Sequence, residues 1–323
     1  MKLCFHSVIA KRRTFLWIIV TCFYSSALHA ASQPLLWQVQ DKDSRVRLYL
    51  FGSLHYGDEA FYPLPDAVLQ AHRDSDVLAV ELDIDALDGE KVRAALKQYG
   101  YYPGEKNLQT QLGAQMWKTL TQVSENLGGD AQQLKQFRPW LAAMQLTNMQ
   151  LSRSDYQQAL GLDKYFLTAS RDKKIILELE SLDEQMQLFN QLSDAEQIEF
   201  LQVTLNEQGK AEESLKRLAD AWYQGDEPTL NELVFSSFRQ RKLGHRLYQF
   251  IFVERNKQML KTINAYMKKA QKIFLVVGIG HMLGEDGLVA LFQAQGYQVT
   301  LVTGVNTEVN MGVNAAVNTG RDD

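Results

Sequence analysis

The mature part of this 323-residue chain lacks cysteine. The chain has two cysteines, Cys4 and Cys22, and both lie in its first thirty residues, a segment that we expect to be removed. The mature protein would then have no disulfide, no thiolate nucleophile and no thiolate metal ligand. The same segment holds 4 of the 34 basic residues and none of the 38 acidic ones, so its loss leaves a formal charge of −8. That charge argues against nucleic acid or an anionic membrane surface as the main partner.

Long apolar runs are also scarce. The longest, Thr14–Leu28, is shorter than the roughly 20 residues of a comfortable membrane span. It follows a basic start (Lys2–Arg13) and precedes small residues that end at Ala30. The pattern predicts a secretory signal peptide over residues 1–30, cleaved near Ala30, and a secreted protein, with the periplasm as the expected location. An uncleaved anchor and lipid attachment at Cys22 are the alternatives, and the bulky residue before that cysteine disfavours the second.

Several familiar catalytic motifs are absent. The sequence has no G-x-S-x-G elbow, no P-loop and no H-E-x-x-H pair of zinc ligands. Gly278-Ile279-Gly280 resembles the start of a dinucleotide fingerprint but lacks the third glycine. The sequence therefore indicates none of the common serine-hydrolase, nucleotide-binding or zincin sites.

What the chain does have is a repeated G-x-x-H motif. Gly52 ends an apolar run that predicts a strand, and His55 follows three residues later. Gly278 and His281 repeat the same order near the C-terminus. In each case a helix and another strand are predicted to follow. Imidazole is a common metal ligand and a general base near neutral pH, so the duplication points to a functional pair. The alternative is that each histidine only hydrogen-bonds a loop.

Glutamates follow two of the predicted strands. Glu81 comes directly after the apolar run Val77–Val80, and Glu180 comes after Ile175–Leu179. Glu178 lies within the second run, and strand alternation predicts that it shares a face with Glu180. A carboxylate that continues a core strand is costly unless it is paired, hydrogen-bonded or bound to a metal. A salt bridge at the end of the sheet is the simpler explanation for either one.

A long helix, predicted from about Gly244 to Lys269, carries three polar residues among its apolar stripes. At 100° per residue, Glu254 extends one stripe, and Arg255 and Asn256 fall on another. We therefore expect all three to be buried with partners. Arg255 is a candidate to hold an anion or an oxyanion, and structural ion pairing is the alternative. Arg138, at the start of another predicted helix, is a weaker candidate of the same kind.

The predicted strands fall at the two ends of the chain and in its middle. We expect an α/β fold with a mixed, mostly parallel central sheet flanked by helices, in one domain over residues 31–303. Large helical insertions are predicted at about 86–172 and 182–270, as a cap over one edge. Residues 304–323 repeat Val-Asn, lack large apolar side chains and are expected to form a disordered tail.

Taken together, these motifs resemble the TraB/GumN family, most closely its bacterial secreted members, over about Leu35–Val302. The ordered matches are Leu50-Phe51-Gly52-Ser53-Leu54-His55, Phe61-Tyr62-Pro63-Leu64-Pro65, Val80-Glu81-Leu82-Asp83, Arg138-Pro139-Trp140, Gly161-Leu162-Asp163, Leu177-Glu178-Leu179-Glu180, Glu254-Arg255-Asn256 and Gly278-Ile279-Gly280-His281. The family is similar in fold to the erythromycin esterases, the haem-binding ChaN proteins and the Tiki proteases. Tiki proteins are metal-dependent peptidases with two G-x-x-H motifs, so the resemblance implies that His55, His281 and Glu81 bind a metal and act in catalysis.

Three functions follow as expectations. The first is a periplasmic metal-dependent hydrolase, a peptidase, in which His55 and His281 hold zinc, manganese or cobalt. Glu81 would be the third ligand or the general base for a bound water, and Arg255 would stabilise the oxyanion. The second is a metal-independent, esterase-like hydrolase with His55 as general base, oriented by Glu81. The third is a non-catalytic protein that binds a peptide or haem. The substrate would be a peptide or small molecule. No stable membrane span is expected after signal cleavage.

Overall fold

The computed structural model describes residues 32–239, 241–269 and 272–303. Six strands form one sheet in the order β4-β3-β5-β2-β1-β6. The strands are β1 (Leu36–Gln40), β2 (Val46–Ser53), β3 (Val77–Val80), β4 (Ile175–Glu178), β5 (Ile273–Gly278) and β6 (Gln298–Leu301). β1 is antiparallel to both of its neighbours, and the other pairs are parallel. The predicted α/β class and the mixed, mostly parallel sheet are therefore confirmed.

The helices fill the chain between these strands. They are α1 (Asp66–Arg73), α2 (Gly89–Ala95), α3 (Leu108–Asn126), α4 (Pro139–Leu151), α5 (Leu162–Ser170), α6 (Leu182–Leu188), α7 (Asp194–Asn206), α8 (Ala211–Gln224), α9 (Glu227–Phe235), α10 (Lys242–Tyr248), α11 (Arg255–Met267) and α12 (Leu288–Ala294). Shorter turns used below are the 3₁₀ turns η6 (Ser236–Arg239) and η8 (Ile279–His281) and the π-helical turn η7 (Gln249–Glu254). None of the helices in the described ranges is long and apolar enough to cross a membrane.

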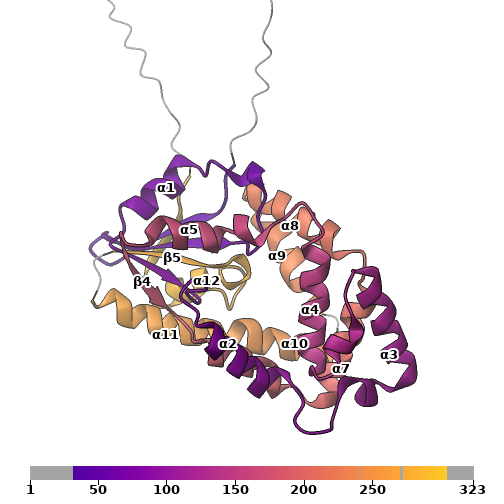
Figure 1. The fold of residues 1–323 in the computed structure, drawn as a ribbon. Helices are drawn as coiled ribbons and strands as arrows, with labels where there is room; N and C mark the ends of the chain where they lie inside the picture. The colour runs from indigo at the N-terminus through magenta and orange to yellow at the C-terminus, as the bar shows by residue number, and fades with distance from the viewer. Residues whose placement is uncertain (1–31, 240, 270–271, 304–323) are drawn as a thin grey trace, which may run out of the picture. The chain divides into compact units, whose positions relative to one another are not determined.

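Helices cover both faces of the sheet. α1 and α5 lie on one side of it and α11 on the other (Figure 1). His72 of α1 and Phe166 of α5 both contact the ring of Phe274 in β5, with centroids 5.4 and 4.8 Å apart. Every residue of β3 is buried, and so are the first five residues of β5. Continuous apolar runs are typical of parallel strands that are covered on both faces, and this burial supplies most of the core.

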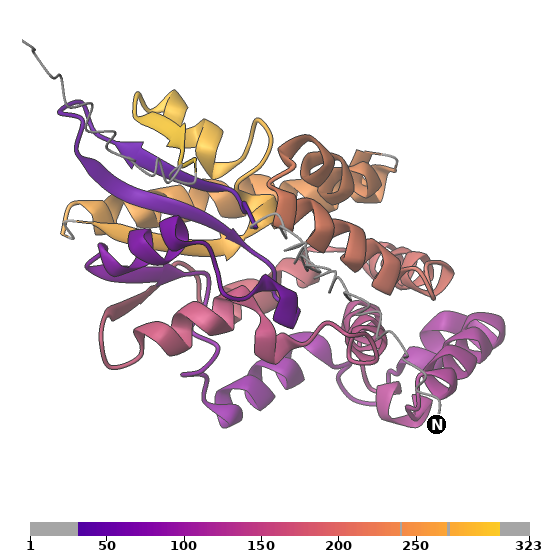
Figure 2. The same cartoon turned by 90° about the horizontal axis from the view of Figure 1, so that it is seen from above.

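The helices α3, α4 and α7 build a second, smaller apolar core away from the sheet (Figure 1). Buried Leu120 and Leu146 belong to this core, which the rest of the article calls the helical insertion core. α7 begins with a capping box, in which the side chains of Ser193 and Glu196 each accept from the other residue's backbone N–H. Figure 2, in which the molecule is seen from above, shows the same helices set apart from the strands.

Two structural expectations need correction. The run Ile175–Leu179 was expected to be a core strand, yet β4 is an edge strand on which Ile175 is 65% exposed. Glu254 was expected to be buried with a partner, but it is exposed. The π-helical turn η7 holds more residues per turn than an α-helix, so an even 100° projection misplaces the residue at its end. The predicted signal peptide and the predicted tail lie outside the described residues.

Candidate active site

The sheet topology brings the two G-x-x-H motifs together. β2 and β5 are parallel neighbours, with Ser53 opposite Gly278, although 226 positions separate the two histidines. β3 pairs with the other side of β5, with Val80 opposite Val276. Glu81 follows β3, so it reaches the same edge as His55 and His281. Residues after the carboxyl ends of adjacent parallel strands converge there, which is where open α/β sheets place ligand sites.

Gly278 stands at the centre of this group. A Cβ atom on it would lie 3.4 Å from Glu81 Oε1, 3.8 Å from His55 Nε2 and 3.9 Å from His281 Cδ2. The three side chains therefore surround one small volume that is open because residue 278 has no side chain. Gly52, its counterpart in the first motif, has a different role. A side chain there would collide with Ile279, so this glycine lets the two strand ends pack closely.

His281 is held in one tautomer by Asn256. The Asn256 amide nitrogen donates to the Asp286 backbone oxygen at 2.7 Å, which turns the amide oxygen toward His281. That oxygen lies 2.6 Å from His281 Nδ1, so Nδ1 carries the proton and Nε2 presents its lone pair. The His281 side chain is only 6% exposed. Burial lowers the pKa of His281 to about 4, although the nearby Glu81 carboxylate opposes this by favouring the charged ring. The imidazole is therefore neutral at neutral pH.

His55 is held in the same way by Asp163. Its Nδ1 lies 2.9 Å from Asp163 Oδ2, and Ser53 Oγ donates to the other carboxylate oxygen at 2.7 Å. The His55 side chain is 65% exposed, so its Nε2 is accessible from solvent. The Asp163 carboxylate raises the pKa of His55 to about 9, because it favours the charged ring.

Asp163 contacts His55, yet the sequence did not nominate it. The only signal was its place in the Gly161-Leu162-Asp163 motif at the start of α5. The Leu162 N–H donates to the Leu54 carbonyl oxygen at 3.0 Å and ties α5 to the loop of His55. A side chain on Gly161 would collide with the His55 backbone. These contacts position the Asp163 carboxylate beside His55.

Glu81 is fixed from two sides. Its Oε1 accepts from the Gly278 N–H at 2.8 Å, and its Oε2 accepts from Arg255 Nη2 at 2.7 Å. Oε1 also lies 3.9 Å from His281 Nε2. Burial disfavours the charged carboxylate, but Arg255, the protonated His55 ring and the Gly278 N–H together hold the pKa of Glu81 below the ordinary value. Glu81 is therefore ionised at neutral pH.

Arg255 joins two strand ends rather than pointing into open space. Its Nε and Nη2 donate to the two oxygens of Glu180 at 2.8 and 2.7 Å, and Nη2 also reaches Glu81. The arginine side chain is 13% exposed. Gln185 donates to Glu180 from the far side at 3.1 Å. This geometry fits the structural ion pair that the sequence left open, and it holds Glu81 in position.

The remaining sequence candidates lie elsewhere. Glu178 is exposed, and its carboxylate accepts from the Asp83 N–H at 2.8 Å, so it does not share the contacts of Glu180. Arg138 belongs to the helical insertion, where it stacks 5.2 Å from the Tyr102 ring and lies 3.8 Å from Asp194. Neither residue contacts His55, Glu81 or His281 in the described part of the chain.

A pocket of about 340 Å³ opens above the strand ends. His55, Glu81, Arg255 and His281 form its polar side. Its other walls are apolar: Leu215 and Leu218 of α8, Val234 of α9 and Ile251 and Phe252 of η7. Such a pocket, with few polar groups converging at one end, is typical of small-molecule and substrate sites.

The donor set suits a divalent ion in its chemistry. Both imidazoles have Nδ1 against an oxygen acceptor, the arrangement by which proteins orient metal-binding histidines. Because the pKa of His55 is raised to about 9, an ion that binds its Nε2 at neutral pH would displace a proton from it. Glu81 Oε1 is the adjacent carboxylate oxygen, and Gly278 leaves the space between the three side chains open. Across the described ranges, however, no three His, Asp or Glu side chains already stand close enough to hold an ion together. Metal binding would therefore require the three donors to draw inward.

Comparison with known proteins gives a consistent result. A sequence model of the TraB/PrgY/gumN family matches residues 35–301. The Escherichia coli K12 protein named "Uncharacterized protein YbaP" is 24% identical over 241 residues, which cover 74% of this chain and 85% of that protein. The YbaP protein of Shigella flexneri matches with the same values. No solved structure matches this chain, so the likeness to erythromycin esterases and ChaN proteins rests on the sequence motifs.

Proposed function

The chain belongs to the TraB/PrgY/gumN family, and from that premise we propose that it is an exported hydrolase that cleaves peptides. In this proposal His55, His281 and Glu81 hold a divalent ion of zinc, manganese or cobalt. The observation that carries the proposal is the convergence of two imidazole rings and a carboxylate oxygen around Gly278. This group lies at the carboxyl ends of three adjacent parallel strands.

The residues of the chain have distinct roles in this scheme. A bound divalent ion would polarise a substrate carbonyl and make a bound water more acidic. Asp163 and Asn256 hold the two histidines with Nε2 directed inward. Glu81 is more suitable as a ligand than as a general base, because a carboxylate of low pKa is a weak proton acceptor. Arg255 is a positioning residue for Glu81, and the apolar walls of the pocket keep water away from a bound substrate.

A metal-free hydrolase is the second candidate, and the 2.9 Å contact between His55 and Asp163 supports it. His55 would be the general base, with Asp163 in the orienting role that the sequence assigned to Glu81. The raised pKa of His55, about 9, means that the ring is protonated at neutral pH and cannot accept a proton. Activity of this kind would rise toward pH 9, and in Asp163→Asn the rise would move to lower pH.

The deciding experiment measures metal content and peptide cleavage on the same purified mature protein. Elemental analysis after dialysis should find one divalent ion per chain in the wild type and a strong loss in His55→Ala and His281→Ala. Cleavage of a peptide library should need the ion and fall by about 10²-fold or more in both variants. His245→Ala is the matched control, because this exposed histidine lies outside the group.

Other outcomes separate the alternatives. Cleavage that survives a chelator but is lost in His55→Ala would favour the metal-free hydrolase. Stoichiometric binding of a peptide or of haem with no turnover under any metal condition would identify a binding protein. Metal content that is equal in the wild type and both histidine variants would remove His55 and His281 as ligands.

Export is part of the proposal. The basic start and the apolar run in residues 1–30 support it, and these residues lie outside the described part of the chain. Mass spectrometry of the protein from a periplasmic extract should give a mature N-terminus near residue 31. A full-length mass in the membrane fraction would contradict it.

A further inference from the structure

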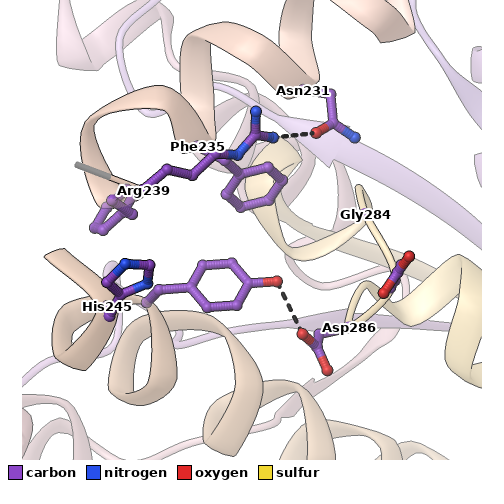
Figure 3. A pocket seen from close by; sticks show the side chains of 9 residues that line it. Asn231, Phe235, Arg239, His245, Gly284 and Asp286 are labelled. Carbon is purple, nitrogen blue, oxygen red and sulfur yellow. Dashed lines mark hydrogen bonds between the residues drawn. The ribbon is translucent and has the colours of Figure 1, made fainter. Parts of the chain in front are cut away.

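A second pocket of about 400 Å³ lies beside the candidate active site, between α9, η6, α10 and the loop before α12. Its lining consists of Asn231, Phe235, Phe238, Arg239, His245, Tyr248, Gly284, Glu285 and Asp286. Figure 3 shows Phe235 and Arg239 along its upper side and Asp286 below them on the right. We refer to it as the aromatic–acidic pocket. Its volume suits a ligand the size of an amino-acid side chain.

The walls of this pocket are aromatic. The rings of Phe235 and Tyr248 meet edge to face, with centroids 5.5 Å apart, and the ring of Phe238 completes the lining. Gly284, at φ +76°, turns the loop so that the two following acidic residues reach the pocket. Aromatic faces carry negative potential, and a cation over them is attracted.

The charges of the pocket are not balanced. Arg239 is already used, because its guanidinium donates to Glu232 at 3.1 Å and to Asn231 at 3.4 Å. The Asp286 carboxylate accepts from the Tyr248 hydroxyl at 2.9 Å but meets no cation. Within the described ranges, no Lys, Arg or His nitrogen lies within 4 Å of Asp286 or Glu285. The pocket thus offers two carboxylates that lack a counter-ion.

From this combination we propose that the aromatic–acidic pocket binds an organic cation with an apolar stem, either an alkyl ammonium or a guanidinium group. The carboxylates of Glu285 and Asp286 would take the charge, and the rings of Phe235, Phe238 and Tyr248 would pack on the stem. Recognition of cations by aromatic rings together with carboxylates follows from the same electrostatics. A lysine or arginine side chain, a peptide amino terminus and a free amine all carry this chemistry.

The pocket shares a wall with the candidate active site. Phe252 packs against Phe235 at 5.1 Å and Tyr248 at 5.8 Å on one side, and against the His281 ring at 5.4 Å on the other. The Asp286 backbone oxygen also holds Asn256, which fixes His281. A ligand that moves Tyr248 or the Asp286 loop would therefore disturb the environment of the His281 ring.

Isothermal titration of the full mature protein tests binding. The probes are agmatine and cadaverine, with neutral 1,5-pentanediol as the matched control. Both cations should bind saturably, more weakly at high salt, and the diol should not bind. Both probes carry an ammonium group, so tighter binding of agmatine than of cadaverine would indicate that the pocket takes the guanidinium end. The proposal is overturned if neither cation binds or if the diol binds as well as they do.

Variants locate the site. Glu285→Gln, a change at an exposed side chain, should weaken cation binding several-fold, and Glu285→Gln with Asp286→Asn should weaken it by about tenfold or more. Asp286→Asn keeps an oxygen that can accept from Tyr248. Glu227→Gln, an exposed acid at the start of α9, is the control and should bind normally. Unchanged binding in both pocket variants would overturn the proposal.

Imidazole ¹⁵N spectra test the link to the active site without any assay of activity. Agmatine should shift the resonances of His281 and leave those of His72 unchanged, because His72 lies on the far side of the sheet core with its Nε2 on Ser170 Oγ. A shift of His72 equal to that of His281 would show a general effect and not a bound ligand next to Phe252.

Discussion

The sheet end that carries the candidate site and the helical insertion core differ in how they treat buried polar groups. At the sheet end, Glu81, Glu180 and Asn256 each have hydrogen-bond partners. Within the described residues, the buried side-chain polar atoms without a protein partner all belong to the insertion: Tyr102 Oη, Thr121 Oγ1, Ser124 Oγ, Arg138 Nε and Gln197 Oε1. Unpaired buried polar atoms cost stability. We infer that the insertion tolerates this cost because its fold depends on apolar packing and not on exact polar contacts.

This difference shows which region is built for exact placement. A site that must hold two histidines in fixed tautomers needs every neighbouring donor and acceptor to be used. The insertion needs only an apolar face on each of α3, α4 and α7 to form its core. We therefore expect polar substitutions to be costly at the sheet end and mild in the insertion.

The largest effect expected is from Arg255→Met. It leaves the carboxylates of Glu81 and Glu180 buried without their cation, which should lower the free energy of unfolding by about 3–5 kcal/mol. The matched change in the insertion, Arg138→Met, should cost about 1 kcal/mol or less, because Arg138 Nε has no partner and Asp194 is 3.8 Å away. Urea unfolding of both variants and the wild type, each first treated with a chelator to remove metal, measures both losses of stability. Equal losses of stability in Arg255→Met and Arg138→Met would contradict the difference between the sheet end and the insertion.

A second effect should appear as the pH falls. His72 is buried, with Nε2 2.7 Å from Ser170 Oγ, and burial followed by nearby lysines lowers its pKa to about 4. The unfolded chain takes up this proton near pH 6.5 and the folded chain only near pH 4. The contribution of His72 to the free energy of unfolding is therefore fully present above pH 6.5 and is lost on acidification. The loss is about 3 kcal/mol at pH 4.

The contribution of His72 is measured by unfolding the wild type and His72→Leu at pH 7 and pH 4.5. The leucine variant should lose clearly less stability on acidification than the wild type. Neither α3, α4 nor α7 contains a histidine, so this titration acts on the sheet region alone. The same pH dependence in both proteins would show that other groups are responsible.

The smallest expected effect concerns two tyrosine hydroxyls, one hydrogen-bonded near the sheet end and one unpaired in the insertion. Tyr62 donates its hydroxyl to the Leu160 carbonyl oxygen at 2.8 Å, whereas the Tyr102 hydroxyl is buried without a partner. Burial raises the pKa of both to about 12. Tyr62→Phe should cost about 1 kcal/mol, and Tyr102→Phe should be neutral or slightly stabilising. Thermal unfolding of both variants checks this, and a cost at Tyr102 would reveal a partner such as bound water.

Much of the architecture could be predicted from local patterns. The strand Val77–Val80 and the helix between it and His55 could be predicted because apolar patterns and turn residues are local signals. The position of a strand within the sheet is not a local property. Ile175–Leu179 is as apolar as a core strand, yet among the described strands β4 lies at the edge of the sheet and pairs with β3 alone. Periodicity also failed at Glu254, where a π-helical turn shifts the register.

The candidate site was predictable in its parts but not in its connections. The repeated G-x-x-H motif marked His55 and His281, and a carboxylate after a buried strand marked Glu81. The acid that orients His55 was not foreseen, because Asp163 lies 108 positions away and Asp is common in the first turn of a helix. The sequence also left open whether Arg255 faces a ligand, and its contacts with Glu81 and Glu180 indicate a positioning role.

The sequence by itself determined the α/β class, the residue types of the site and the family, because these depend on local composition and on motif order. Only the tertiary structure decided that β2, β5 and β3 are neighbours, and this adjacency is what gathers His55, His281 and Glu81 around Gly278. It also decided which nitrogen of each histidine is free and placed the aromatic–acidic pocket behind Phe252. The physical reason is that hydrogen bonds and burial depend on neighbours in space, which the order of residues along the chain does not specify.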